Sequence, residues 1–590
     1  MKCKICEMAC DINEHSTGRC KTYQLDGDKI IQDPDLGYLG AFPVSIETIP
    51  MLHYYPAGKF LQVFSTGCNF QCPGCIARLL ATRKSLGWQT LSPDQVIETA
   101  LKLGCKGIAS TLNEPAANFY MFRELALKAR EKGLLVGCSS NCYFTEETIE
   151  ELARFVNFMN VGIKGYSDDA YRNCGVLSSK PVFRNIAKLH RMGVHVEVSA
   201  VYLKGNEEDV IQVARNLANI STSIPLQLMR FIPFGDAPIT LEPSIGASER
   251  LCNSLHDHLE HVYLFNSPGT GLMHTYCPEC GEIVTEREFY GPMGSRLLKP
   301  WSNYTCKCGH DIPVTGTGAI ESFSESGFMG GYRISRAFGM VHAVLTCLGI
   351  PEEERMLEVW KEISSSEVLM DIHHMIQNPT SYLEYIRLIA DKAGVQEKGE
   401  DLISFISKRL ELIEKVALEN DGGSAYYCMG SPLFALNAGR MENNLVNFAG
   451  GRSINKLLQK EGKPGFNVNP GFINDNNPKT IFISGFLSRP LYEFYGLCKY
   501  YGIEADAVKQ QRIYALPPSW DFGSPRWILG LLYIADKLYP GKLEIDIEQE
   551  ANTFYIRYYG IYYTDAKPNR SFHRPSSGIW PREVAGCTHA

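Results

Sequence analysis

The chain has 590 residues, which is too long for one hydrophobic core, so two to four domains are expected. Hydrophobic residues make up 45% of the chain and charged residues 21%, as in an ordinary globular protein. The net charge is −7 and Lys and Arg form no long run, which argues against nucleic acids and anionic membranes as partners.

The first 45 residues are rich in cysteine and predict a small metal-binding segment. No apolar core of signal-peptide length opens the chain, and no apolar run is long enough to span a bilayer, so a cytoplasmic location is expected. Cytoplasmic cysteines stay reduced, which favours metal ligands over disulfides. A zinc module, an iron–sulfur module and a reduced segment without metal are the alternatives for Cys3, Cys6, Cys10 and Cys20.

From residue 60 to about 231, short apolar segments alternate with amphipathic ones. The segments expected as buried strands are 60–65, 106–111, 134–140, 158–164, 194–205 and 225–231. Those expected as helices are 93–104, 122–133, 145–155, 180–193 and 207–220. Repeated βα units predict an α/β fold with a partial (β/α) barrel over residues 46–265.

Three cysteines directly follow the first of these strands. Cys68, Cys72 and Cys75 have the spacing C-x3-C-x2-C. Three thiolates leave one iron of a [4Fe–4S] cluster open to a small ligand, such as the methionine part of S-adenosylmethionine. The position also suits barrel chemistry, which lies at the carboxyl ends of strands. A zinc loop with a distant fourth ligand is the alternative.

Several motifs in register carry a family resemblance. STGCNFQCPGC at 65–75, STLNEP at 110–115 and IPLQLMRFIPFG at 224–235 stand in order along the chain. The stretch from about 60 to 235 resembles radical S-adenosylmethionine (radical SAM) proteins related to glycyl-radical-enzyme activases, in particular the AmmeMemoRadiSam group. The resemblance implies a [4Fe–4S] cluster, S-adenosylmethionine and an electron donor such as flavodoxin or ferredoxin. It also places Asn113 and Glu114 in the loop that contacts the methionine amino group.

Asn113 and five further polar residues are predicted to bind the cofactor. Glu114 offers an acceptor for an ammonium group, and Ser140 and Asn141 offer hydrogen bonds at the next strand end. Lys164 and Glu197 stand at strand positions expected to face a barrel mouth. For each of these residues the alternative is a solvated or paired surface residue. Gly74 departs from the family pattern, which has an aromatic residue before the third cysteine, and Phe70 is the candidate substitute.

A second metal site is predicted within residues 266–320. Two cysteine knuckles, Cys277 with Cys280 and Cys306 with Cys308, stand about 25 residues apart. Two such turns supply four sulfurs to one tetrahedral centre. Structural zinc or a rubredoxin-like iron is preferred to an auxiliary iron–sulfur cluster.

Residues 325–562 form the last predicted domain, and residues 563–590 a loose extension. The region 400–560 resembles the C-terminal lobe of metal-chelate-binding proteins, which deliver siderophores, haem or cobalamin to importers. Helix 398–420 would match the long interlobe helix of that fold. Trp520, Arg526, Trp527 and Tyr514 are candidate ligand-wall residues, because Trp and Arg suit flat ligands with carboxylates. His373 and His374 could supply an axial metal ligand but are interpreted as ordinary helix residues, and a core position is also preferred for Trp527.

Three functions follow from this organisation. The first is a radical SAM enzyme that modifies a small molecule, such as a chelated metal or tetrapyrrole, presented by the C-terminal domain. The second is an activase-like enzyme acting on a partner protein. The third is a non-enzymatic metallophore-binding protein, against which the intact cysteine triad and the STLNEP loop argue.

Overall fold

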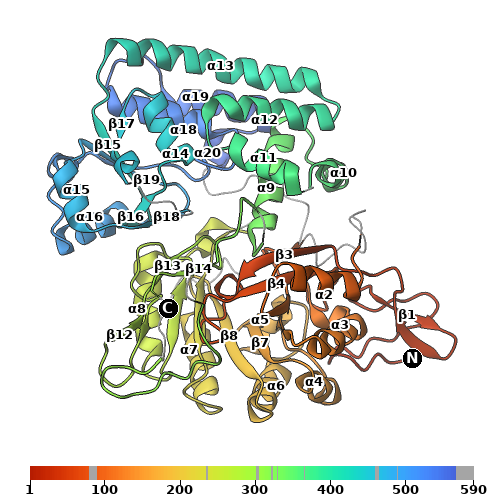
Figure 1. Ribbon diagram of the computed structural model, residues 1–590. Helices are drawn as coiled ribbons and strands as arrows, with labels where there is room; N and C mark the ends of the chain where they lie inside the picture. The colour runs from red at the N-terminus through yellow and green to blue at the C-terminus, as the bar shows by residue number, and fades with distance from the viewer. Residues whose placement is uncertain are drawn as a thin grey trace, which may run out of the picture.

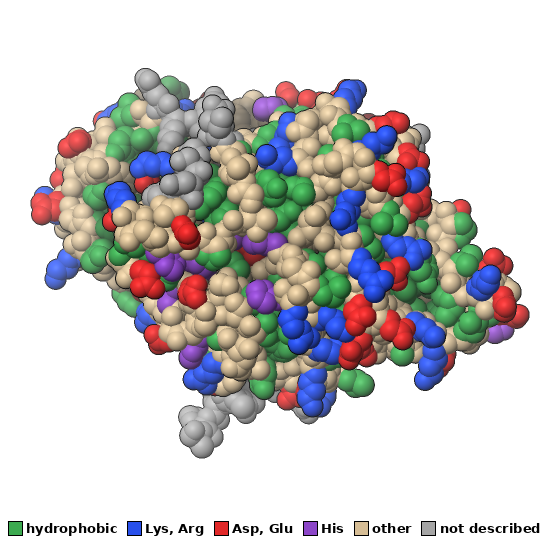
Figure 2. Space-filling view, turned by 60° about the horizontal axis from the view of Figure 1, so that its bottom comes forward, with side chains coloured by type: hydrophobic (Ala, Val, Ile, Leu, Met, Phe, Trp, Pro, Cys, Tyr) green, Lys and Arg blue, Asp and Glu red, His purple; other side chains and the backbone are tan. Residues whose placement is uncertain are grey.

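The computed structural model describes residues 1–78, 90–233, 237–299, 304–319, 323–328, 330–364, 366–458, 464–487 and 489–566. Most of the predicted extension 563–590 therefore lies outside the described residues. Within them, no helix combines the length and the apolarity that crossing a membrane requires. Basic and acidic side chains are interspersed on the face shown in Figure 2.

An eight-stranded sheet forms the first half of the molecule, with its strands side by side in chain order. Its strands are β3 (Gly40–Ser45), β4 (Lys59–Phe64), β5 (Gly107–Ser110), β6 (Leu135–Ser140), β7 (Phe158–Ile163), β8 (His195–Tyr202), β9 (Leu226–Arg230) and β10 (Val262–Phe265). β3 pairs antiparallel with β4, and every later pair is parallel. This is the predicted partial barrel.

The crossover helices pack on the outside of this sheet (Figure 1). They are α2 (Pro93–Lys102), α3 (Phe119–Glu131), α4 (Glu146–Ala153), α5 (Asp168–Asn173), α6 (Lys180–Arg191), α7 (Glu207–Ala218) and α8 (Ile245–Leu255). The start of α2 shows how local sequence sets these boundaries. Ser92 accepts a hydrogen bond from the Gln95 amide, the Gln95 side chain accepts one from the Ser92 amide, and Pro93 fills the first helical position.

Two small modules flank the barrel. The N-terminal segment contains the hairpin β1 (Tyr23–Asp26) and β2 (Lys29–Gln32). After β10 come two more hairpins, β11 (Thr275–Tyr276) with β12 (Ile283–Thr285) and β13 (Arg287–Phe289) with β14 (Ser295–Leu297). The turn between β11 and β12 carries the first predicted cysteine knuckle.

The second half begins with five helices and continues as an α/β unit. The helices are α9 (Arg333–Cys347), α10 (Glu353–Ile363), α11 (Ser366–Met375), α12 (Pro379–Lys392) and the 24-residue α13 (Gln396–Glu419). The strands are β15 (Ser424–Met429), β16 (Ser431–Leu436), β17 (Arg452–Ser453), β18 (Gly465–Asn467), β19 (Thr480–Ile483) and β20 (Ile513–Ala515). The later helices are α14 (Met441–Phe448), α15 (Pro470–Asn476), α16 (Leu491–Tyr500), α17 (Asp506–Lys509), α18 (Trp527–Leu538), α19 (Ile547–Tyr559) and α20 (Tyr563–Ala566). The predicted fold class, an α/β barrel followed by a second α/β domain, is confirmed.

One apolar core joins the two halves. It includes Phe64, Met229 and Phe265 from the barrel together with residues of α9–α13 and of the second sheet. In Figure 1 the C-terminal helices and sheet lie against one end of the barrel, with α9 reaching down toward β3. The C-terminal domain is therefore packed onto the barrel rather than tethered beside it.

Candidate active site and metal centres

The cluster loop leaves β4 at its carboxyl end and carries Cys68, Cys72 and Cys75. All three side chains are half-buried. The loop starts at Gly67, whose φ of +94° suits glycine, and a Cβ there would lie 2.8 Å from Thr22 and 3.0 Å from Ala117. The chain can therefore make this close approach to the N-terminal segment only with glycine.

The three thiols fit an iron site rather than a set of free thiolates. Burial raises the pKa of Cys68 and of Cys75, and a hydrogen bond with Cys174 followed by burial raises the pKa of Cys72. Positive charge favours the thiolate form of buried cysteines, and bound iron would supply it in addition to Lys164. In the described part of the chain, the three sulfurs do not all lie within 4.8 Å of one another, so they form no compact site for a single ion.

Lys164, which follows β7, directs positive charge at the same loop. Burial alone would lower its pKa, but the sulfurs of Cys72, Cys174 and Cys75 outweigh that effect and the pKa is raised. The lysine is thus cationic and placed among the cluster ligands. Lys164 was predicted from the sequence, whereas Cys174, ten residues further along the chain, was not.

Glu114 is held by a network at the ends of β5 and β6. Ser140 donates its hydroxyl to Oε1 at 2.6 Å, the Asn141 amide donates to Oε2 at 2.8 Å, and the Ala116 amide donates to Oε1 at 3.3 Å. Burial raises the pKa of Glu114, while these three donors lower it. A carboxylate accepts about four hydrogen bonds, so one position remains on Oε2 for an ammonium donor.

Asn113 and Asn141 position the neighbouring loops. Asn113 accepts from the Ser65 amide at 3.0 Å, which ties its loop to the start of the cluster loop. Asn141 donates to Oδ1 of Asn69 at 2.7 Å and lies 3.9 Å from the Cys68 sulfur. Asn69, inside the cysteine motif, was not selected from the sequence. The structure thus brings Asn113, Glu114, Ser140 and Asn141 together beside the cysteines.

Two non-glycine residues adopt left-handed backbone in these loops. Leu112 has φ of +64° and Cys142 has φ of +59°. Such a conformation costs about 1–2 kcal/mol per residue. The surrounding contacts must therefore supply that energy, which is typical of functional loops.

Glu197 is not part of this group. It is the third residue of β8, near the amino end, and it is fully buried. Its carboxylate accepts from the backbone amides of Leu52 and His53 at 2.9 and 2.8 Å and from Gln227. The expectation that it faces the barrel mouth is corrected: Glu197 closes the opposite end of the barrel by bonding the segment before β4.

Gly74, the departure from the family pattern, lies against another aromatic residue. A Cβ at Gly74 would lie 3.3 Å from Ala237 and 3.6 Å from the Phe231 ring. Phe70 packs instead on Tyr143 and Tyr171, with ring centroids 5.3 and 6.1 Å away. The aromatic residue beside Gly74 is therefore Phe231, which follows β9, and not Phe70.

The two cysteine knuckles form one compact centre. Cys277 and Cys308 have sulfurs 3.6 Å apart, and the sulfurs of Cys280 and Cys306 are 3.5 Å apart. Tetrahedral Zn–S bonds of about 2.3 Å place sulfurs about 3.8 Å apart. These four are the one cysteine, histidine or carboxylate group in the described part of the chain whose ligand atoms all lie within 4.8 Å. The geometry fits one metal ion, although the second knuckle has one residue between its cysteines and the first has two.

The C-terminal candidates occupy different positions from those expected. Trp520, Arg526 and Trp527 are 2%, 3% and 0% exposed, so they are core residues and not a ligand wall. Tyr514 is half-buried beside Phe482. His373 packs edge-on against Phe328 at 5.0 Å within the helical layer, as expected for an ordinary helix residue.

Tyr332 brings the C-terminal domain to the cluster loop. It precedes α9. Burial raises its pKa to about 12; in addition, the charge of Lys164 lowers this pKa and that of Cys75 raises it. Tyr332 and Cys75 both pack against the core that joins the two halves. No sequence signal marks this residue, because its position depends on how the domains pack.

Comparison with known proteins agrees with this geometry. Residues 63–217 match the model of the radical SAM superfamily. The match supports a radical SAM domain here, and an enzyme of that class. The uncharacterized protein MJ0808 of Methanocaldococcus jannaschii is 26% identical over 326 residues, which cover 53% of this chain and 95% of MJ0808.

Solved structures with partial similarity are solute-binding proteins. A periplasmic solute-binding protein of Veillonella parvula is 20% identical with a TM-score of 0.29, covering 33% of this chain and 61% of that one. Helicobacter pylori CeuE with Ni(II) bound is 18% identical with a TM-score of 0.28, covering 32% and 62%. The chain thus spans less than two thirds of either structure.

Proposed function

We propose that the protein is a radical SAM enzyme that modifies a small molecule held between the barrel mouth and the C-terminal domain. The observation that carries this proposal is that Tyr332, at the start of the C-terminal domain, lies close enough to Lys164 and Cys75 for their charges to shift its pKa. A substrate held at this junction would lie near the cluster loop. A low-potential donor such as flavodoxin or ferredoxin would supply the electron.

Different barrel residues would bind the cluster and S-adenosylmethionine. Cys68, Cys72 and Cys75 would hold a [4Fe–4S] cluster, which when reduced breaks a carbon–sulfur bond of S-adenosylmethionine and yields a carbon radical. Glu114 offers its remaining acceptor position to the methionine ammonium group. The Phe231 ring beside Gly74 offers a flat apolar surface to the adenine.

The orientation of the two sheets supports a small-molecule substrate. A Cβ at Gly430, which follows β15, would lie 2.8 Å from Ile245 and 3.2 Å from the Pro268 carbonyl, beyond β10. The segments that follow β15 and β10 therefore lie in contact. Ligands of open parallel sheets bind outside the carboxyl ends of the strands, so a molecule at the junction would touch both domains.

A half-buried arginine on α9 suits a flat anionic ligand. Arg336 lies 4.3 Å from the Phe486 ring centroid, whereas Arg440 is already paired with the buried Glu442 at 2.6 Å. Guanidinium groups stack on aromatic faces and pair with carboxylates in two hydrogen bonds. A chelated metal or tetrapyrrole with carboxylate side chains has matching chemistry.

The radical chemistry is tested by Cys72→Ala. The variant should lose formation of 5′-deoxyadenosine and methionine from S-adenosylmethionine under dithionite, to the level without protein, because one of three iron ligands is gone. Cys105→Ala is the matched control, since Cys105 lies outside every cysteine group and should retain activity. Equal turnover in Cys72→Ala would rule out the proposed enzyme class.

The substrate class is tested by titration. A corrinoid, a haem and a ferric catecholate are added separately to the reconstituted protein, and the optical spectrum is followed. One of them should bind, and Arg336→Gln should weaken it at least about tenfold, the loss of a charged pair worth about 1.4 kcal/mol or more. If none binds and a protein substrate acquires a radical instead, the activase-like alternative is correct.

A further inference from the structure

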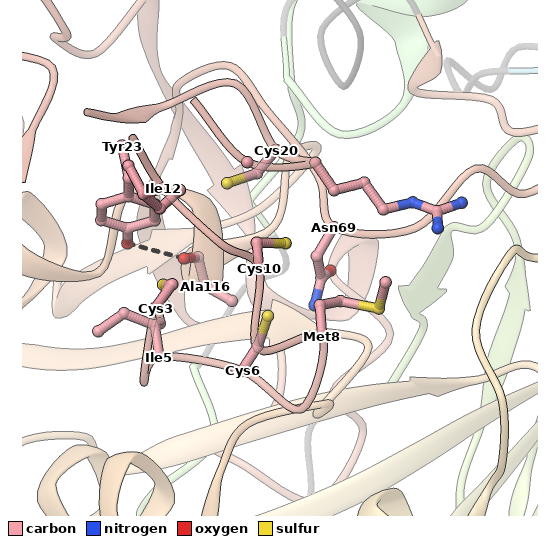
Figure 3. A pocket seen from close by; sticks show the side chains of 12 residues that line it. Cys3, Ile5, Cys6, Met8, Cys10, Ile12, Cys20, Tyr23, Asn69 and Ala116 are labelled. Atoms are coloured by element: carbon pink, nitrogen blue, oxygen red, sulfur yellow. Dashed lines mark hydrogen bonds between the residues drawn. The ribbon is translucent and has the colours of Figure 1, made fainter. Parts of the chain in front are cut away.

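An organic ligand needs more room than the N-terminal cysteines leave. Cys3, Cys6, Cys10 and Cys20 surround the small cavity shown in Figure 3, whose volume of about 10 Å³ is filled by one water molecule. The four sulfurs do not all lie within 4.8 Å of one another, although all four belong to the described residues. The interior of the barrel is different, because solvent reaches residues of its central strands.

Three residues on neighbouring central strands keep some solvent exposure. They are Ser139 of β6, Gly162 of β7 and Val201 of β8, and Val201 is 37% exposed. Successive side chains of a strand point to opposite faces of the sheet. The adjacent residues Cys138 and Val161 pack in the core under the outer helices and are fully buried. The exposure of the three residues therefore comes from inside the barrel, which is open to solvent at this level.

Lys164 and Val201 stand at the entrance to this interior. A Cβ at Gly162 would lie 3.5 Å from Nζ of Lys164 and 3.8 Å from the Ser140 carbonyl, so the ammonium group lies over the inner side of β7. The register pairs Gly162 with Ser199, which puts Val201 at the level of Lys164 on the next strand. One cation and one apolar side chain thus border the way into the barrel.

Below the entrance the wall consists of uncharged polar side chains. Nδ2 of Asn160 donates to Oγ of Ser199 at 3.0 Å, and Ser199 donates to Oε1 of Gln227 at 3.2 Å. Gln227 in turn donates to Glu197, which closes the amino end of the barrel. Hydrogen bonds among its own members and to Glu197 therefore hold this layer in place.

Gln62 and Ser139 face the same interior with polar atoms left over. Gln62 of β4 points inward, because its neighbours Leu61 and Val63 pack in the outer core. It is 1% exposed, and its Nε2 donates to Oγ1 of Thr111 at 2.7 Å. Among the residues that the structure describes, neither Oε1 of Gln62 nor Oγ of Ser139 has a hydrogen-bond partner. A buried acceptor without a partner costs free energy, which a ligand that donates a hydrogen bond would recover.

We propose that the substrate places an uncharged group with an N–H or O–H donor, such as a carboxamide or a hydroxyl, inside the barrel against Gln62 and Ser139. Oε1 of Gln62 only accepts hydrogen bonds, which disfavours a carboxylate, and Lys164 at the entrance disfavours an ammonium group. Val201 would contact the carbon atoms next to the polar group. The inference rests on the proposed radical SAM function and deepens it, because it names the substituent of the small molecule that approaches the cluster.

Binding is tested with propionamide and butanone on the full chain, reconstituted anaerobically and without S-adenosylmethionine. The two probes have nearly the same shape, but only propionamide donates a hydrogen bond. Saturation-transfer NMR should give a Kd at least about tenfold lower for propionamide, since butanone leaves the acceptor unpaired. Gln62→Met should remove this preference, whereas Gln510→Met, at an exposed glutamine, should keep it.

Val201→Phe provides a second variant in case Gln62→Met does not fold. It fills the entrance and should weaken the binding of both probes. Equal affinities of the parent for propionamide and butanone would overturn the assignment and leave the polar layer as a site for water only.

A second measurement places the bound group beside the reacting carbon. With S-adenosylmethionine and dithionite, propionamide deuterated on carbon should pass deuterium to 5′-deoxyadenosine, which mass spectrometry detects. One C–D bond of the probe breaks and one forms in 5′-deoxyadenosine, and the carbon radical left on the probe takes an electron from dithionite and a proton from water. Gln62→Met should lower the label at least about tenfold, with total 5′-deoxyadenosine within about twofold of the parent.

The outcomes separate this inference from the proposed function. Equal label in the parent and in Gln62→Met would overturn the inference. So would an equal fall in label and total cleavage, because the polar layer would then bind S-adenosylmethionine. Absence of cleavage by the parent would refute the proposed function and leave the binding result standing.

Discussion

Single residues around the cluster loop set its charge, and Lys164 is the clearest case. Its ammonium group lies among the sulfurs of Cys72, Cys75 and Cys174, which raise its pKa. A reduced cluster carries one more negative charge, which a nearby cation stabilises by about 1–3 kcal/mol at an effective dielectric constant of 20. Lys164→Met should therefore lower the reduction potential of the catalytic cluster by roughly 40–130 mV.

An EPR-monitored redox titration measures this effect. Lys164→Arg keeps the charge and should shift the potential much less. A potential that is unchanged in Lys164→Met would mean that the lysine serves the structure of the loop alone.

Residue identity within motifs was predictable from the sequence, whereas burial was not. Cys68, Glu114 and Asn141 meet because each follows a neighbouring parallel strand, an arrangement that periodicity reveals. Trp520 and Glu197 were misplaced because an aromatic or acidic residue in a short apolar context has the same signature in a core as in a pocket. Only the packing of distant segments decides between the two.

At the scale of elements, the knuckle centre lies next to a loop, residues 304–315, that hydrogen-bonds to the barrel. The Pro313 carbonyl lies 3.0 Å from Nδ1 of His53, and the Thr315 amide donates to the His53 carbonyl at 2.8 Å. The loop has backbone hydrogen bonds of its own, such as that from the Cys306 amide to the His310 carbonyl at 2.8 Å. A structural metal site would add folding free energy to them directly. Spacing in the sequence predicted the ligands, but the contacts to His53 join residues some 260 positions apart.

Cys280→Ser should release this metal and leave the catalytic cluster in place. Elemental analysis is expected to show the loss of one metal ion per chain with unchanged acid-labile sulfide. Hydrogen exchange should increase over residues 304–315. Glu279→Ala, an exposed neighbour within the same knuckle, is the control and should retain the ion. Unchanged exchange in metal-free Cys280→Ser would show that the loop is ordered without metal.

At the scale of the whole molecule, the sequence predicted a partial barrel followed by a second α/β domain but not how the two meet. The barrel follows from local alternation, and α13 follows from helical periodicity over 24 residues. The junction depends on contacts between residues far apart in the chain, such as the Asn467 amide and Glu288 at 3.1 Å, or the Ser45 amide and Glu325 at 2.9 Å. Each partner alone looks like an ordinary surface residue, so no local pattern marks the pair.

Arg489 provides the sharpest test of this junction. It is 5% exposed overall and pairs with Glu249 of α8 at 3.0 Å and with Glu493 of α16 at 3.5 Å. Breaking a buried pair leaves an uncompensated charge and costs about 3–5 kcal/mol, and the lower end applies because Glu249 is partly exposed. Arg489→Met should therefore increase hydrogen exchange in Ile245–Leu255 and Leu491–Tyr500 together, while cleavage of S-adenosylmethionine by the barrel persists.

Arg452→Met removes a solvent-exposed partner of Asp421 and should change neither helix. If exchange rises in α16 alone, Arg489 stabilises its own helix and does not hold the C-terminal domain over the barrel mouth.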